Sequence, residues 1–255
     1  MNILHICDWY SPIGGVEKLL FDTLGSLEQK GHTNIVVFND NPNQHPTGKR
    51  IEYPCQYLEF FVYFHPGNPS LTMQAIPRLK EIIARHAPDV CHIHNFQNPY
   101  ITEFLLKEIP CVRSVHDPRL YCFTNWRLLP DHSICPYPLG LECLRQGCLS
   151  PGLKPKTDFD LNAHWVLKHH NLHKKMPALI LESRAQINCV LQNGFSPKQI
   201  FWLPNFTPTR SMCEVREFVA KYYDPSERIV LFVGRASYEK GAHVLIESCR
   251  YLLST

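Results

Sequence analysis

Short apolar runs alternate with amphipathic segments along most of this chain, and this alternation limits the fold more than any other feature. Strands are expected at residues 2–7, 34–38, 88–94, 111–115, 178–181 and 200–203, with helices at 16–30, 70–86, 102–107, 160–175 and 183–193. Continuous apolar runs are typical of strands that are buried on both faces. The pattern therefore predicts an α/β protein with a parallel sheet and helices on both of its faces.

A strand, a glycine turn and a helix start follow one another near the end of the sequence. The apolar run at 229–233 is expected to form a buried strand that Gly234 ends, and a helix is expected from about Gly241. Arg235 and Lys240 lie in the turn, where both cations can converge on one anion. A helix start adds unpaired backbone N–H groups. This segment is a candidate diphosphate site, and the alternative is a solvated charged turn.

Two further candidates lie where expected strands end, which is the edge at which open parallel sheets bind ligands. Gly14 and Gly15 precede a helix and would let the backbone approach a phosphate closely, or they form an ordinary turn. His116 and Asp117 follow the strand at 111–115. The imidazole of His116 can hydrogen-bond a sugar hydroxyl, or it only caps its loop.

The strand at 88–94 carries two alternating histidines, His92 and His94, which project to one face of the sheet. They are a candidate metal pair. Because neither a carboxylate nor a cysteine partner is near them in the sequence, a packed and hydrogen-bonded face is the preferred interpretation.

A cysteine-rich insertion interrupts the α/β pattern at residues 118–155. It contains Cys122, Cys135, Cys143 and Cys148, outside any expected strand or helix. Four thiolates can hold a structural zinc ion or an iron–sulfur cluster, although the spacing lacks a CxxC pair. Free or redox-labile thiols, and a catalytic role, stay open as alternatives.

The composition indicates a folded globular protein and gives no indication of nucleic-acid binding. The 255 residues are 44% hydrophobic and 19% charged, and the net charge of +3 is too small to indicate nucleic-acid binding. No apolar run approaches the roughly 20 residues of a membrane span, and the first residues lack the features of a signal peptide. Several of the eleven cysteines lie in apolar segments, so reduced thiols and a cytoplasmic location are expected.

The helix expected at 160–175 is basic between His164 and Lys175, with Trp165 and Leu172 among its apolar positions. Such a helix can touch an anionic membrane surface, which would place the protein at the inner face of the membrane. The alternative is a solvated helix on the surface of the domain.

Taken in order, seven motifs resemble the GT4-type retaining glycosyltransferases of the GT-B fold. They are ILHI at 3–6, GGVE at 14–17, PDVCHIHN at 88–95, VHD at 115–117, LPN at 203–205, FVGR at 232–235 and EKG at 239–241. The resemblance covers nearly the whole chain. It implies two Rossmann-like domains that face each other across a cleft, and transfer of a sugar from a nucleotide-diphosphate donor to a glycan or lipid-linked acceptor.

The resemblance also implies roles on the donor side. Gly14 and Gly15 would lie near the donor phosphate, and His116 would lie beside the transferred sugar as the catalytic residue. Arg235 and Lys240 would neutralise the leaving diphosphate, so that catalysis needs no metal ion.

On the acceptor side, His94, Asn95 and Asp117 are the candidates. The implied organisation is an amino-terminal domain at 1–207, a linker at 208–225 and the start of a nucleotide-sugar-binding domain at 226–255.

The family's downstream glutamates are not present, and Phe206 stands where a glycine usually follows the LPN motif. We therefore expect an amino-terminal fragment that lacks its carboxy-terminal half and is inactive alone. The alternative is a non-catalytic acceptor-binding or scaffold domain, perhaps as half of a split enzyme.

Overall fold

The computed structural model describes residues 1–8, 10, 14–39, 57–61, 69–149, 163–207, 211–224, 226, 228–236 and 238–252. The chain divides into two compact units, Met1–Thr207 and Pro208–Thr255. The first unit thus ends at the residue where the sequence predicts the end of the amino-terminal domain. The sheet and the turn with Arg235 and Lys240 therefore belong to different units.

The first unit is built on a parallel sheet of seven strands in the order β3-β2-β1-β4-β5-β6-β7. These are β1 (Asn2–Cys7), β2 (Thr33–Asn39), β3 (Tyr57–Phe61), β4 (Val90–Ile93), β5 (Cys111–Val115), β6 (Ala178–Leu181) and β7 (Ile200–Trp202). The strand order reverses between β1 and β4, which makes this the switch point of a doubly wound sheet. The predicted Rossmann-like parallel sheet is confirmed.

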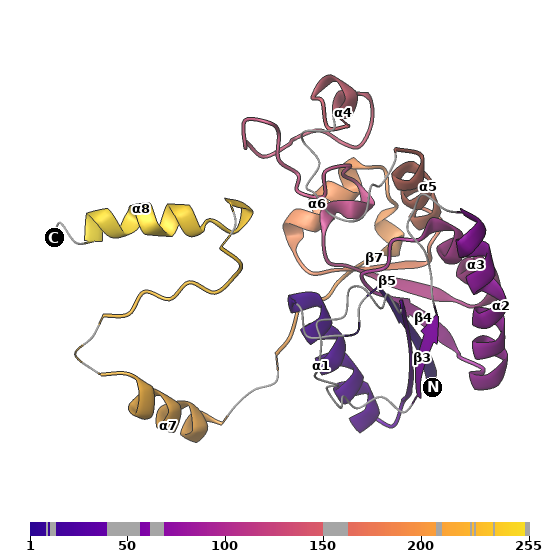
Figure 1. Ribbon diagram of the computed structural model, residues 1–255, viewed down its shortest axis with the longest axis horizontal. Coiled ribbons are helices and arrows are strands. Elements are labelled where there is room, and N and C mark those ends of the chain that lie inside the picture. Colours follow the sequence, from indigo (N-terminus) through magenta and orange to yellow (C-terminus); the bar gives the residue numbers. More distant parts are fainter. Residues whose placement is uncertain are drawn as a thin grey trace. The chain divides into compact units, whose positions relative to one another are not determined.

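Helices cover both faces of the sheet (Figure 1). They are α1 (Gly15–Gln29), α2 (Pro69–His86), α3 (Pro99–Glu108), α4 (Leu141–Arg145), α5 (Ala163–His173) and α6 (Arg184–Gln192), with 3-10 turns η1 (Pro118–Leu120) and η2 (Pro197–Gln199). Figure 1 shows α1 on one side of the sheet and α2 with α3 on the other. The described helices include none that is both long enough and apolar enough to cross a membrane.

The two faces of the sheet differ in chemistry. Towards α2 and α3, β1 presents Leu4 and Ile6, which belong to the large apolar core of the unit. Towards α1, a smaller cluster joins Cys7 to Leu20 and Phe38. Because side chains alternate along a strand, His5 lies on the α1 face between these apolar positions. The α1 face is therefore the polar one.

The insertion after β5 has little regular structure among its described residues. It contains η1, α4 and one isolated antiparallel bridge between Leu128 and Ile134. Its local core joins Phe123, Cys143 and Cys148 to the start of α5. Residues 150–155 of the predicted insertion lie outside the described part of the chain.

The second unit contains α7 (Met212–Tyr222), the turn η3 (Tyr238–Lys240) and α8 (Ala242–Leu252). The predicted strand at 229–233 is wrong, because these residues have no strand assignment and Leu231 and Val233 are 73% and 84% exposed. A strand needs a neighbour for its backbone hydrogen bonds, and the described part of this unit supplies none. The helix predicted from about Gly241 is present as α8.

Candidate functional site

The carboxyl end of β5 delivers His116 to the edge of the sheet where ligands are expected. Its side chain is 3% exposed, and Nδ1 forms a close hydrogen bond with Oε1 of Glu182. The other ring nitrogen, Nε2, is buried and has no hydrogen-bond partner among the described residues. A carboxylate only accepts hydrogen bonds, so the proton of neutral His116 lies on Nδ1 and Nε2 keeps a lone pair.

Glu182 directly follows β6 and was missed by sequence reasoning. Its backbone N–H donates to Oε1 of Gln186 at 2.9 Å, and Nε2 of Gln186 donates to the carbonyl of Val115 at 3.1 Å. The start of α6 thereby ties the ends of β5 and β6 together. The sequence feature that could have identified Glu182 is its position directly after an apolar strand, which places it at the same edge of the sheet as His116.

Asp117 is engaged within its own loop. Its carboxylate caps η1 by accepting from the N–H of Arg119 at 3.0 Å, and it forms an ion pair with Nε of Arg119, also at 3.0 Å. These contacts hold the loop that carries His116.

Gly14 stands at the N-cap of α1 without a side-chain cap, in an extended conformation (φ −157°). A Cβ at this position would lie 3.1 Å from Oε2 of Glu17, whereas a Cβ on Gly15 would meet nothing within 4 Å. The buried carboxylate of Glu17 therefore occupies the space beside Gly14. The helix start offers backbone N–H groups, with one anionic side chain already near them.

A row of polar side chains crosses the α1 face of the sheet next to His116. His5 of β1 and His92 of β4 are register partners, and the ring of His94 lies 6.1 Å from that of His116 in a stacked orientation. His5 Nδ1 and His94 Nε2 are 3.1 Å apart. The packed, hydrogen-bonded face expected for His92 and His94 is present, and His5 is an additional member.

Burial lowers the pKa of every imidazole in this row. It lowers the pKa of His5 to about 4 and those of His92 and His94 well below the usual value of 6.5, and their mutual repulsion adds to the effect for His92 and His94. Arg113, buried behind them, has its pKa lowered by burial to about 10, while the carboxylates of Asp117 and Asp8 favour its charge. The imidazoles are thus neutral at neutral pH.

The acceptor-side candidates differ in accessibility. His94 is 2% exposed and is engaged with His5, whereas Asn95 is half-buried. The carbonyl of Asn95 accepts from the N–H of Asp8 at 2.9 Å, which ties the ends of β1 and β4 together. Both residues stay near the edge of the sheet that carries His116.

The four cysteines of the insertion are not assembled as a metal site. Among the described residues, one group of three or more His, Cys, Asp or Glu has its ligand atoms within 4.8 Å of one another, and that group is His5, His92 and His94. Burial raises the pKa of Cys143 and raises that of Cys148 to about 11, and the charges of Cys122 and Cys135 add to both shifts. The thiols are near enough to interact electrostatically, so the four-thiolate site stays a prediction that requires them to move together.

The basic helix α5 turns most of its histidines inward. His169, His170 and His173 are buried, and Nζ of Lys168 pairs with Oε2 of Glu103 at 2.6 Å. Of the expected basic surface, Lys174 and Lys175 remain exposed. The surface expected to touch a membrane therefore exposes fewer cations than the sequence indicates.

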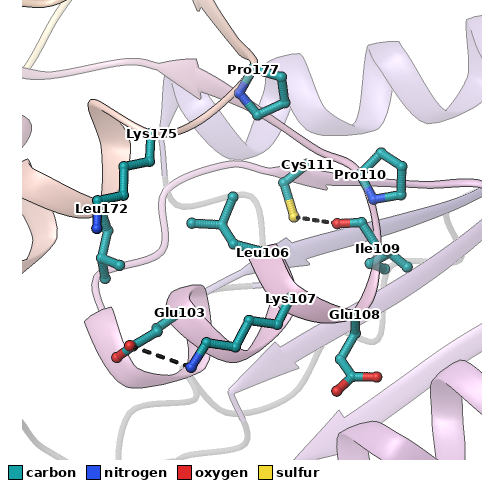
Figure 2. A pocket seen from close by; sticks show the side chains of 10 residues that line it. All are labelled: Glu103, Leu106, Lys107, Glu108, Ile109, Pro110, Cys111, Leu172, Lys175 and Pro177. Carbon is teal, nitrogen blue, oxygen red and sulfur yellow. Dashed lines mark hydrogen bonds and ion pairs between the residues drawn. The ribbon is translucent and has the colours of Figure 1, made fainter.

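An open groove of about 560 Å³ lies at the opposite edge of the sheet (Figure 2). It is lined by the end of α3, the residues that lead into β5 and β6, Leu172 of α5, and Lys175 just after α5. These are the amino ends of the strands, whereas ligands of such sheets bind at the carboxyl ends. We place the candidate site at His116 rather than in this groove.

In the second unit, Arg235 precedes η3 and Lys240 is the last residue of η3, and both are exposed. Gly241 has φ +74°, a conformation that favours glycine, and its position directly before α8 allows the turn to enter the helix. The two cations are thus carried by a turn at a helix start, as the sequence predicts.

Comparison with known proteins gives one family and a set of distant structures. The model of Glycosyltransferase Family 4 matches residues 13–210. A glycosyltransferase from Rickettsia africae ESF-5 is 16% identical with a TM-score of 0.57, covering 98% of this chain and 57% of that one. Sucrose-phosphate synthase from Thermosynechococcus elongatus is 14% identical with a TM-score of 0.59, covering 97% of this chain and 59% of that one. No curated protein sequence matches the chain.

At these identities the structural likeness shows the fold alone. The chain spans less than two thirds of the length of either structure. The fold shared with them is that of the amino-terminal domain of a GT-B glycosyltransferase.

Proposed function

Because the chain belongs to Glycosyltransferase Family 4, we propose that it supplies the acceptor-side domain of an enzyme that transfers a sugar with retention of configuration. The donor is a nucleotide-diphosphate sugar and the acceptor is a glycan or a lipid-linked glycan. The transferred group would lie at the carboxyl edge of the sheet, beside His116.

The observation that carries this proposal is the pairing of His116 with Glu182. The carboxylate fixes the proton of the imidazole on Nδ1 and leaves the lone pair of the buried Nε2 without a protein partner. A buried acceptor without a partner costs about 1–3 kcal/mol. A sugar hydroxyl that donates to Nε2 would remove this cost, so the site favours a polyhydroxyl ligand.

The remaining roles concern the diphosphate. The uncapped start of α1 offers backbone N–H groups, and Arg235 with Lys240 would stabilise the charge that develops on the leaving diphosphate. This electrostatic role can replace a metal ion, so we propose that transfer itself needs no metal. The free thiols of the described cysteines accord with a reducing, cytoplasmic location, with any membrane contact peripheral.

A transfer assay tests the proposal. The purified chain is incubated with a panel of radiolabelled nucleotide sugars and glycan or lipid-linked acceptors, alone and together with a separately produced nucleotide-sugar domain from a family member. We expect no transfer by the chain alone, transfer in the combined reaction, and loss of that transfer in His116→Ala. His164→Ala is the matched control, because His164 is exposed on α5.

Full activity of His116→Ala in the combined reaction would contradict the assignment of the site. Transfer by the isolated chain would contradict the proposal that it supplies only the acceptor-side domain.

A second candidate function is a non-catalytic acceptor-binding or scaffold domain. The exposed apolar residues of the second unit favour it, since Leu231, Val233 and Ile246 are each at least 70% exposed. Glycan binding by the chain, without transfer in any combination, would support this function over the first.

A further inference from the structure

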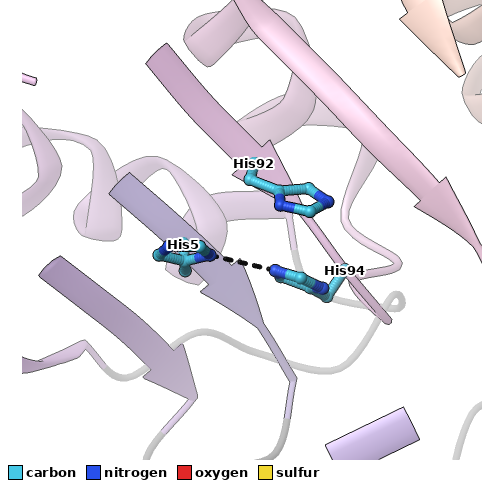
Figure 3. Close-up of side chains that lie close together, drawn as sticks. All are labelled: His5, His92 and His94. Atoms are coloured by element: carbon cyan, nitrogen blue, oxygen red, sulfur yellow. Dashed lines mark hydrogen bonds between the residues drawn. The ribbon is translucent and has the colours of Figure 1, made fainter. Parts of the chain in front are cut away.

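Three imidazoles meet on the α1 face of the sheet (Figure 3). His5 comes from β1, His92 is its register partner on β4, and His94 follows β4 on the same face. One ring nitrogen from each lies within 4.8 Å of the other two. His5 Nδ1 and His94 Nε2 are 3.1 Å apart, as the dashed line in Figure 3 marks.

Polar side chains hold the ring nitrogens that face away from this cluster. Nδ2 of Asn34 donates to the carbonyl of Leu24 at 3.0 Å, which turns Oδ1 of Asn34 towards Nε2 of His5 at 3.1 Å. Neutral His5 therefore carries its proton on Nε2 and presents the lone pair of Nδ1. In the same way, Oγ of Ser114 lies 2.8 Å from Nε2 of His92, which leaves Nδ1 of His92 to the cluster.

We propose that His5, His92 and His94 bind one divalent transition-metal ion of the Zn²⁺ class and thereby connect β1 to β4. Imidazole nitrogens are preferred ligands of such ions, and three histidines with a water in the fourth position form a complete zinc coordination sphere. Two nitrogens at about 2.0–2.1 Å from a tetrahedral Zn²⁺ lie about 3.3 Å apart. His5 Nδ1 and His94 Nε2 are already close to this spacing, so mainly His92 has to approach.

The contacts of Asn34 and Ser114 are of the kind that supports metal ligands. A histidine that binds a metal usually donates its second ring N–H to an oxygen, which fixes the ring and raises its basicity. His5 has such an oxygen in Asn34, and His92 has one in Ser114. Burial alone also requires such partners, so the meeting of three ring nitrogens, rather than these contacts, carries the proposal.

Charge partly opposes an ion at this place, whereas the exposure of His92 favours access. The positive charge of Arg113 disfavours a second cation at His94, and the carboxylates of Asp117 and Asp8 offset the charge of Arg113. His92 is only partly buried, while His5 and His94 are 0% and 2% exposed. An ion can therefore reach the cluster from the side of His92.

Reconstitution with metal tests the proposal without any substrate. The purified chain is stripped with a chelator, loaded with Zn²⁺ or Co²⁺ and desalted, and its metal content is measured by mass spectrometry. We expect one ion per chain, a higher melting temperature, and a Co²⁺ spectrum with ligand-field bands but no sulfur-to-cobalt charge-transfer band. Absence of bound metal after loading, or a strong charge-transfer band that places the ion on thiolates, would overturn it.

Variants assign the site. His92→Gln should abolish stoichiometric binding, and Ser114→Ala should weaken it 10–100-fold, a typical effect of losing a partner behind a ligand. Ser114→Ala makes a small change in the sheet and serves as the second test if His92→Gln does not fold. His164→Gln, on the exposed side of α5, should bind as the unaltered chain does. Unchanged affinity in Ser114→Ala and His92→Gln would show that the imidazoles form only a hydrogen-bonded core.

Discussion

The buried histidines of α5 should make the first unit unfold cooperatively in mild acid. His169, His170 and His173 are 2%, 6% and 0% exposed, and burial lowers the pKa of each. His170 Nδ1 lies 3.0 Å from the carbonyl of Leu120, and His173 Nδ1 lies 2.6 Å from the carbonyl of His169. Both carbonyls accept from Nδ1–H and by themselves raise the pKa, but burial lowers the pKa by more, so the folded state favours the neutral rings.

The sign and size follow from proton linkage. Folded pKa values below the unfolded value of about 6.5 mean that the unfolded chain binds more protons below that pH. The contribution of these histidines to the free energy of unfolding is therefore fully present above pH 6.5. It is lost as the pH falls towards their folded pKa values. A histidine whose folded pKa lies well below the working pH adds at most about 1.4 kcal/mol per pH unit to the slope, so about 4 kcal/mol per unit is the upper limit for the three of α5.

The histidines of the sheet, when they bind no metal, add to this dependence of stability on pH. His5 alone, with a folded pKa of about 4, accounts for about 3 kcal/mol between pH 6.5 and pH 4. His92 and His94 act in the same direction. Against a typical unfolding free energy of about 5–15 kcal/mol, the first unit should lose its folded state within about two pH units below 6.5.

Urea denaturation at several pH values between 7.5 and 5, in the presence of a chelator, measures the slope. His170→Gln keeps a donor for the carbonyl of Leu120 and removes one titrating group, so its slope should be smaller, by at most about 1.4 kcal/mol per pH unit. His164→Gln, at an exposed position of the same helix, should not alter the slope. Equal slopes for the unaltered chain and His170→Gln, or a flat profile down to pH 5, would refute the reasoning.

Three other substitutions test separate parts of the structure. Gly14→Ala should lower the free energy of unfolding by about 0.5–1 kcal/mol, because alanine is a poor N-cap and its Cβ crowds Glu17. Gly15→Ala, the control, should be neutral or stabilising. Equal effects of the two changes in urea denaturation would contradict the contact between position 14 and Glu17. Glu182→Gln should populate the second tautomer of His116, which imidazole ¹⁵N NMR detects, and an unchanged spectrum would show that Glu182 does not orient the ring. Trp165→Phe removes the donor to the buried carbonyl of Gln97 (2.7 Å) and should cost about 1–3 kcal/mol in thermal or urea unfolding; a cost near zero would mean that water replaces the indole.

The sheet was readable from the sequence because its strands are buried on both faces. The runs at 2–7, 111–115 and 178–181 coincide with β1, β5 and β6, a polar or charged residue follows each of them, and a proline precedes the last two. The run at 229–233 is also apolar and forms no strand. A local pattern predicts a capacity for pairing, and pairing also needs neighbouring strands, which the described part of the second unit does not provide.

The site could be predicted only in part from the sequence, because its contacts depend on which strands are neighbours in the sheet. His116 was found from its place after an apolar run, but its partner Glu182 lies 66 residues away in the sequence. Similarly, His5 meets His94 over a separation of 89 residues. Register between parallel strands is set by the helices that connect them, so the spacing of two histidines in one strand could not reveal the third.

The unequal faces of the sheet explain how the fold tolerates a polar row in its interior. On the side of α2 and α3, β1 and β4 contribute Leu4, Ile6 and Ile93, which are fully buried, and each such side chain contributes about 1.5–3 kcal/mol. On the side of α1, the same strands contribute His5 and His92, whose ring nitrogens must be matched by Asn34 and Ser114 to avoid a penalty of similar size. Apolar burial on the face towards α2 and α3 thus stabilises the sheet, and the face towards α1 contains the ionisable side chains next to His116. Substitution of imidazoles on that face should therefore alter proton and metal binding more than it alters the fold.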